Sequence, residues 1–202
     1  KYDDGAKVNS HGRNNSQTLH CGDIETNYTL EKAAKVKAAA EMVVNFAETL
    51  DDHDRVIFKY PKMVLGVGEK ECQQLRERFE KFKTVFTTMQ LLEKEQIAEI
   101  EPNVIMVDGK MREEPCVALA VLDEYSAVDY HQLAQRFVQE ANKNTDKAIS
   151  LCLNSHVENI VEQDGVFSIV TQNQVIKAKT VVVSAGGHSL LLAQQMGYGL
   201  EY

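Results

Sequence analysis

Several features that mark large classes of protein are missing from this chain of 202 residues. No stretch approaches the roughly 18–20 consecutive apolar residues of a membrane span, so these residues contain no transmembrane helix. No run of lysine and arginine stands out, and 30 acidic residues against 22 basic ones give a net charge of −8. Because this balance offers no basic surface for a phosphate backbone, we expect no nucleic-acid partner.

Closely spaced cysteines and clustered metal ligands are missing as well. No secretory signal precedes the cysteines, and widely spaced cysteines without one are typical of reduced thiols in a cytoplasmic protein. A zinc cage needs ligands at short, regular spacing, and the six histidines are as dispersed as the cysteines, so we expect no metal site. The four cysteines are Cys21, Cys72, Cys116 and Cys152.

Apolar residues recur at helical spacing in several stretches. Between Thr29 and Leu50 they recur every three or four residues, which predicts an amphipathic helix with Thr29 as its N-cap. Residues 72–86 repeat this spacing, and Glu93–Ile100 predicts a short helix that Pro102 ends. A further helix is expected after Asp129, which resembles the first residue of a capping box with Gln132. Its inward side would be Leu133, Phe137 and Ala141.

Short β-type runs lie between these helices and fill the last sixty residues. The first two are separated by Pro61 and predict a hairpin, and the next two lie around a turn at Asp108-Gly109. The later four predict a β-meander with a strong hairpin turn at Asp164-Gly165. The runs are Arg55–Lys59, Met63–Val67, Val104–Val107, Cys116–Leu122, Ala148–Leu153, Val157–Glu162, Val166–Thr171 and Gln174–Lys177.

A continuously apolar run, residues 180–184, follows the meander and leads through Ala185-Gly186-Gly187 into a helix over residues 189–196. Such a run is typical of a strand buried on both faces of a parallel sheet. Glycine lets the backbone come close to a ligand, so the turn predicts a ligand at the carboxyl end of the sheet. A tight strand-to-helix turn without a ligand explains the same residues.

The meander, the apolar strand and Ala-Gly-Gly together resemble the closing half of a two-dinucleotide-binding-fold flavoprotein. The opening loop adds a more specific pattern, Asn-Asn-x-x-Thr-x-His at residues 14–20 followed by Glu-x-Asn-Tyr-Thr at residues 25–29. This register resembles the malate:quinone oxidoreductases, a branch of the FAD-dependent oxidoreductases related to D-amino-acid oxidase. Looser elements at residues 91–102 and 127–133 extend the likeness over nearly the whole chain, whereas Gln17 and Leu19 replace small residues usual in that branch.

The resemblance implies an α/β fold: part of a two-dinucleotide-binding-fold FAD domain, with a mixed sheet and a β-meander, and a portion of an α+β substrate domain. Residues 1–50 would be an FAD-contacting loop and helix, 51–125 part of the substrate or cap domain, and 126–202 the continued FAD-binding domain. The family opens with a Gly-x-Gly-x-x-Gly turn that this chain does not contain. The resemblance therefore implies an internal piece of a longer flavoenzyme, inactive by itself.

FAD is the cofactor that the resemblance implies, held by two groups of residues. The loop from Asn14 to His20 would run past the pyrophosphate and the flavin, although a solvated polar loop is the alternative. Val157 would present its backbone to the adenine, unless it is plain meander core. The cofactor-binding residues would be Asn14, Asn15, Ser16, Gln17, Thr18, Val157, Ala185, Gly186 and Gly187.

His20 is the candidate catalytic residue, because a neutral imidazole can take a hydroxyl proton while a hydride leaves the neighbouring carbon. It could equally hydrogen-bond the flavin or hold the loop. Arg13, Lys59 and Lys62 are candidate partners for a substrate carboxylate, or else surface charges.

The resemblance further implies oxidation of a 2-hydroxy acid, malate to oxaloacetate in the tricarboxylic acid cycle, with electrons passed to a quinone. It implies a cytoplasmic protein, with a peripheral position at the inner face of the plasma membrane open to the intact enzyme. The alternatives are another oxidase of the superfamily, acting on 2-hydroxyglutarate or an amino acid with oxygen or another acceptor, and a non-catalytic binding domain.

Overall fold

The computed structural model describes residues 5–143 and 149–199, which belong to two compact units. We call residues 16–133 the central unit, and residues 1–15 with 134–202 the terminal unit. The units are divided at other positions than the functional parts expected from the sequence, 1–50, 51–125 and 126–202. That functional division stays a prediction.

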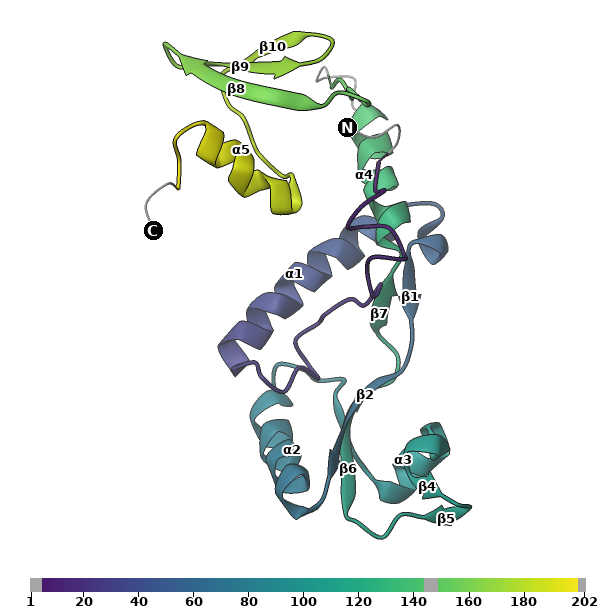
Figure 1. The fold of residues 1–202 in the computed structure, drawn as a ribbon. Coiled ribbons are helices and arrows are strands. Elements are labelled where there is room, and N and C mark those ends of the chain that lie inside the picture. Colours follow the sequence, from purple (N-terminus) through teal and green to yellow (C-terminus); the bar gives the residue numbers. More distant parts are fainter. Residues whose placement is uncertain (1–4, 144–148, 200–202) are drawn as a thin grey trace. The chain divides into compact units, whose positions relative to one another are not determined.

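Two long, extended stretches of the central unit run antiparallel to each other and pass from one small sheet into the next (Figure 1). β1 pairs with β7, and β2 pairs with β6, whose other edge carries β3. The hairpin expected between β1 and β2 is wrong, because the two strands lie in different sheets and each pairs with a strand far away in the sequence. The strands are β1 (Ile57–Lys59), β2 (Lys62–Val67), β3 (Gln90–Glu93), β6 (Cys116–Val121) and β7 (Tyr125–Val128).

Helices cover both faces of the sheet around β6 and one face of the β1–β7 sheet, and they confirm the helical periodicity of the sequence. α1 begins after Thr29, whose side chain accepts a hydrogen bond from the Lys32 N–H. α2 and α3 pack on opposite faces of β6, all six of whose residues are buried. The turn at Asp108-Gly109 joins β4 to β5 and does not lead into β6. The bounds are α1 (Leu30–Glu48), η1 (His53–Arg55), α2 (Glu69–Phe82), α3 (Lys94–Ile100), η2 (Pro102–Val104), β4 (Met106–Val107) and β5 (Lys110–Met111).

The terminal unit contains the predicted β-meander, with strand order β10-β9-β8. Asp164 and Gly165 both have positive φ, at 53° and 73°, which is the geometry of the predicted tight hairpin turn. α4 starts in the central unit, where the Asp129 carboxylate accepts a hydrogen bond from the Gln132 N–H as a capping residue does. The bounds are α4 (Tyr130–Lys143), β8 (Val157–Gln163), β9 (Val166–Thr171), β10 (Val175–Ala178), η3 (Gly186–His188) and α5 (Ser189–Gln195).

Two predicted strands of the terminal unit are wrong. Residues 149–153 and 180–184 form no strand, and Ala148, where the first was expected to begin, lies outside the described residues. A strand needs a neighbour for its backbone N–H and C=O groups, and within the described ranges neither segment lies in a ladder. Val182, expected in the middle of a buried strand, is 83% exposed, and Phe137, expected on the inward side of α4, is 48% exposed.

Candidate functional site

Part of the loop over residues 14–20, which was expected to contact the cofactor, lies at the edge of a sheet. Between residues 16 and 21 it runs beside β7, where the Leu19 N–H donates to the Ser126 carbonyl at 2.9 Å. The Gln17 carbonyl accepts from the Val128 N–H, also at 2.9 Å, and Thr18 forms an isolated bridge with Ala127. This part of the loop is therefore a fixed third member of the β1–β7 sheet.

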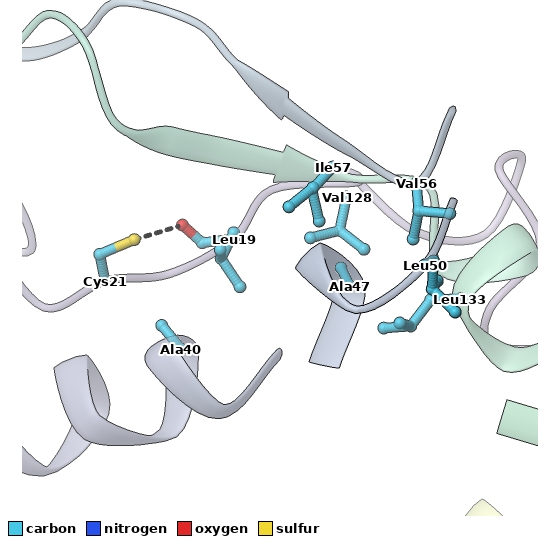
Figure 2. Close-up of a cluster of buried hydrophobic side chains, with 9 residues drawn as sticks. All are labelled: Leu19, Cys21, Ala40, Ala47, Leu50, Val56, Ile57, Val128 and Leu133. Atoms are coloured by element: carbon cyan, nitrogen blue, oxygen red, sulfur yellow. Dashed lines mark hydrogen bonds between the residues drawn. The ribbon is translucent and has the colours of Figure 1, made fainter. Parts of the chain in front are cut away.

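Side chains along this edge alternate between two faces. Figure 2 shows Leu19 and Cys21 on the side of α1, where they are buried in one cluster with Ala40 and Ala47 of that helix. Thr18 and His20 lie on the other face and are exposed. Burial raises the pKa of the Cys21 thiol, which is a core group. The polar side chains that could meet a ligand thus all leave the same side of the sheet.

Two aromatic rings, those of Phe58 and Tyr60, lie on that same side of the sheet, next to a β-bulge in β7. Phe58 pairs with Ala127 and Lys59 pairs with Tyr125, so Ser126 is the extra residue of β7. The Ser126 hydroxyl accepts from the Tyr60 N–H at 3.0 Å and donates to the Tyr60 carbonyl at 2.7 Å, which holds the bulge in place. The Phe58 and Tyr60 rings stack with centroids 6.1 Å apart. We call this surface the open face; its residues are Thr18, His20, Phe58, Tyr60 and Ala127.

His20 contributes the imidazole of the open face. Its ring Nδ1 lies 2.9 Å from Oε1 of Glu25, and the His20 side chain is 62% exposed whereas that of Glu25 is 16% exposed. An ionised carboxylate only accepts hydrogen bonds, so this contact favours the tautomer with hydrogen on Nδ1 and a lone pair on Nε2. Sequence reasoning named His20 and missed the role of Glu25, although the glycine between them indicated a turn.

That turn is built around Gly22 and a buried ion pair. Gly22 has φ +85°, and a Cβ there would lie 2.4 Å from the Ala33 carbonyl oxygen of α1, so no larger residue fits. The next residue, Asp23, is 1% exposed. Its carboxylate accepts from the Ile24 N–H at 2.8 Å and lies 2.7 Å from the Lys62 ammonium of β2. The loop is consequently fixed at its tightest point from both the helix and the sheet.

Arg78 of α2 fixes the far end of the turn. Its guanidinium donates to the main-chain carbonyls of Glu25 at 2.7 Å and Tyr28 at 2.9 Å, and it lies 3.7 Å from the ring centroid of Phe82. Burial lowers the pKa of Arg78, and the negative charges of Glu25 and Asp23 counteract this shift. Glu25 is therefore held by its backbone, independently of its contact with His20.

The basic residues considered as carboxylate partners are engaged elsewhere or lie in the other unit. Lys62 is 12% exposed in its pair with Asp23, which makes it a structural cation. Lys59 lies 3.3 Å from Asp123 on the α1 side of the sheet. Arg13 belongs to the terminal unit and is exposed. Lys59 and Lys62 are thus absent from the open face.

Gln17 and Thr18 also anchor the start of α4. Gln17 has φ +60°, an unusual conformation for a residue with a side chain. Its amide oxygen accepts from the Tyr130 N–H at 2.9 Å, and the Tyr130 hydroxyl donates to the Thr18 carbonyl at 3.1 Å. Burial raises the pKa of Tyr130. The Gln17 side chain, expected at the cofactor, is therefore used by the protein itself, whereas the exposed Ser16 and Thr18 hydroxyls still fit the expected role.

The remaining candidate cofactor residues lie in the terminal unit. Asn14 donates from its side chain to the Val8 carbonyl at 2.9 Å, and Asn15 follows it. Gly186 has φ +58°, and a Cβ there would lie 3.1 Å from the Asn9 amide nitrogen, so the opening segment passes close to the Ala-Gly-Gly turn. A Cβ at Gly187 would meet nothing within 4 Å, and residues 185–187 are exposed. This accessible backbone fits a closely approaching cofactor; Val157 is half-buried at the start of β8.

Comparison with known proteins gives consistent matches. A family model described as "Malate:quinone oxidoreductase (Mqo)" matches residues 1–199. The probable malate:quinone oxidoreductase of Campylobacter jejuni is 38% identical over 206 residues, which cover 100% of this chain and 46% of that protein. The malate:quinone oxidoreductase of Helicobacter pylori is 37% identical over 198 residues, which cover 97% of this chain and 44% of that protein. The chain therefore spans about half the length of the curated relatives it matches.

Solved structures show a similar fold at low sequence identity. Glycine oxidase from Geobacillus kaustophilus matches with a TM-score of 0.65 and 16% identity, over 90% of this chain and 47% of that one. L-proline dehydrogenase from P. horikoshii matches with a TM-score of 0.65 and 14% identity, over 88% and 45%. These matches confirm the mixed α/β class. Within the described residues, no helix is long and apolar enough to cross a membrane, and no group of three or more potential ligands is placed to hold a metal.

Proposed function

The chain belongs to the malate:quinone oxidoreductase family, and from this premise we propose that the whole protein is an FAD-dependent dehydrogenase that oxidises malate to oxaloacetate and passes the electrons to a quinone. The observation that supports the proposal is the open face, on which the His20 imidazole and the Thr18 hydroxyl share one side of the sheet with the Phe58 and Tyr60 rings. A quinone acceptor further implies that the intact enzyme reaches a membrane surface as a peripheral protein.

FAD, when bound, supplies the acceptor for the hydride that leaves C2 of the substrate. In the terminal unit, the residues proposed to contact it are the exposed backbone of Ala185, Gly186 and Gly187, the Asn14 and Asn15 side chains and the backbone of Val157. In the central unit, they are the Ser16 and Thr18 hydroxyls. We exclude the Gln17 amide oxygen from this set, because it is occupied by the Tyr130 N–H.

The residues of the open face perform the remaining tasks. His20 takes the proton of the substrate hydroxyl at Nε2, because an alcohol is too weak an acid to lose its proton to water at neutral pH. Phe58 and Tyr60 cover the reacting carbon with apolar surface and exclude water from it. Alternation along the paired strands places the rings and the imidazole on one side of the sheet.

Anaerobic titration of the full-length flavoprotein tests this function. Malate should bleach the flavin without any NAD, a quinone analogue should restore the colour, and little hydrogen peroxide should appear in air. If malate fails and 2-hydroxyglutarate or an amino acid bleaches the flavin, the substrate is wrong and the flavoenzyme assignment stands. A colourless, flavin-free full-length protein would refute both and favour a non-catalytic binding domain.

A further inference from the structure

We propose that Glu25 is the positioning residue of His20: its carboxylate holds the imidazole with hydrogen on Nδ1, so that Nε2 accepts the hydroxyl proton of the 2-hydroxy acid. The proposal rests on the proposed function of the whole protein and assigns a role to an acid that does not itself touch the substrate. It starts from the 2.9 Å contact between His20 Nδ1 and Glu25 Oε1.

The chemistry of the pair is that of an acid that orients a base. A neutral imidazole has one donor and one acceptor nitrogen, and the tautomer decides which of them faces the substrate. With the Glu25 carboxylate at Nδ1, the acceptor is Nε2. When Nε2 takes up a proton, the ring becomes an imidazolium whose positive charge lies next to the Glu25 carboxylate, which stabilises it.

The surroundings of Glu25 show which partner is fixed. Arg78 holds the Glu25 main-chain carbonyl at 2.7 Å, and the Gly22 turn is pressed against α1. The side chain of Glu25 is mostly buried, and within the described residues its Oε2 has no hydrogen-bond partner. The more exposed His20 ring is therefore oriented by a mostly buried carboxylate on a fixed stretch of backbone, and within the described residues that carboxylate makes no competing hydrogen bond.

The charges buried around this turn argue that the contact between His20 and Glu25 is not an incidental surface contact. The turn buries the carboxylate of Asp23 and the ammonium of Lys62, and it places Arg78 where burial lowers its pKa. Burying charges is expensive even when they are paired. A loop that only leads from the edge of the β1–β7 sheet into α1 does not need buried charges. A loop that holds a base in one orientation must be rigid, and the buried ion pair makes it so.

The balanced step uses only these groups, the substrate and the flavin. The substrate O–H bond breaks and its proton bonds to His20 Nε2, while the C2–H bond breaks and its hydrogen leaves with the electron pair to FAD. The hydroxyl oxygen and C2 then form the carbonyl of the 2-oxo acid. Substrate is oxidised by two electrons, the flavin is reduced by two, and His20 returns its proton to water.

The test is a double-mutant cycle in the full-length flavoprotein, with malate as donor and an artificial dye as acceptor. Glu25→Gln should lower kcat about tenfold or more and leave KM within about threefold, because the acid orients the base without touching the substrate. His20→Asn should lower kcat about 100-fold or more. The double variant should match His20→Asn alone, because Glu25 acts only through His20. The matched control is Glu31→Gln, which removes an exposed acid of α1 and should leave kcat unchanged.

The outcomes separate this proposal from the function on which it rests. If wild-type protein does not oxidise malate, the proposed substrate fails, and the cycle is repeated with the donor that bleaches the flavin. The positioning role is wrong if wild type is active and Glu25→Gln matches it, or if Glu25→Gln lowers kcat further in the His20→Asn background. Flavin content and melting temperature report on folding. Should Glu25→Gln lose its flavin, Glu25→Asp replaces it in the cycle, with the same criteria.

Discussion

Replacing Lys62 by Met should destabilise the protein strongly, because it leaves a buried carboxylate without its counter-charge. Lys62 lies 2.7 Å from Asp23, and their side chains are 12% and 1% exposed. Removing one partner of a buried pair costs about 3–5 kcal/mol. Since Asp23 keeps the hydrogen bond from the Ile24 N–H, we expect the lower end, about 3 kcal/mol. At roughly 2–4 °C per kcal/mol for 150–250 residues, this corresponds to a fall in Tm of about 6–12 °C.

Thermal unfolding followed by circular dichroism measures this loss, and a second variant separates charge from packing. Lys62→Met combined with Asp23→Asn removes the uncompensated charge and should recover more than half of the lost Tm. The reasoning is refuted if Lys62→Met unfolds within about 2 °C of wild type, or if the double variant is no more stable than the single one.

The pH dependence gives an independent check on the same pair. Burial lowers the pKa of Lys62, but the hydrogen bond and negative charge of Asp23 outweigh burial, so the pKa in the folded state is raised. In the unfolded chain the lysine pKa is about 10.4. The ion pair therefore contributes its full share to the free energy of unfolding below that pH, and this share is lost as pH rises through the higher folded pKa. The stability gap between wild type and Lys62→Met should therefore narrow only in strongly alkaline solution.

Three further predictions concern other parts of the chain. Arg76→Ala should cost only about 0.2–1 kcal/mol in urea unfolding, because Arg76 and Glu93 are half exposed. The hydrogen bond from Arg76 lowers the pKa of Glu93, so this small stabilisation is present above the unfolded pKa of about 4.3 and is lost as pH falls through the lower folded value. Gly22→Ala should cost about 2–4 kcal/mol or prevent folding, since its Cβ would lie 2.4 Å from a backbone oxygen of α1, and an unchanged Tm would contradict this steric argument. Asn15→Ala and Thr18→Ala should each lower the flavin content of the purified full-length protein, as each removes a hydrogen bond worth roughly 0.5–1.5 kcal/mol; full retention in both would indicate a solvated loop.

The helices could be predicted from the sequence because each carries its own local signals. The three-to-four spacing of α1 and its Thr29 cap, and the glutamate before α3, act within one or two turns of chain. The Asp164-Gly165 hairpin is equally local. Strand partners are not local: β1 and β2 are adjacent in sequence yet pair with β7 and β6, and no periodicity indicates that Pro61 continues an extended chain.

The two apolar runs that form no strand also show that strand formation depends on distant partners. Residues 149–153 and 180–184 have strand-like composition, and composition predicts what a segment would do beside a suitable neighbour. In the described residues no ladder includes them, and Val182 stays 83% exposed. Strand propensity is realised only through pairing, which depends on residues far away in the sequence.

The site shows how far a motif can indicate geometry. The spacing of residues 14–20 and 25–29 indicated the family and led to His20. The sequence did not show that two polar side chains in and between these segments serve the fold itself. Gln17 serves the start of α4, and Asp23 is buried against Lys62. Only the structure shows that alternation along the edge strand sends Leu19 and Cys21 into the core and His20 outward.

Strand pairing and the turn at Gly22 together explain why His20, the candidate base, lies on the open face next to Glu25. Phe58 pairs with Ala127, which also faces Thr18, so alternation along the strands puts the Phe58 and Tyr60 rings on the open face. The edge strand beside β7 brings His20 to the same face. Gly22 then reverses the chain so that Glu25 returns to the imidazole. Each of these steps uses backbone geometry that is set by packing in the central unit, so a change in that packing should alter kcat through His20 without touching the substrate.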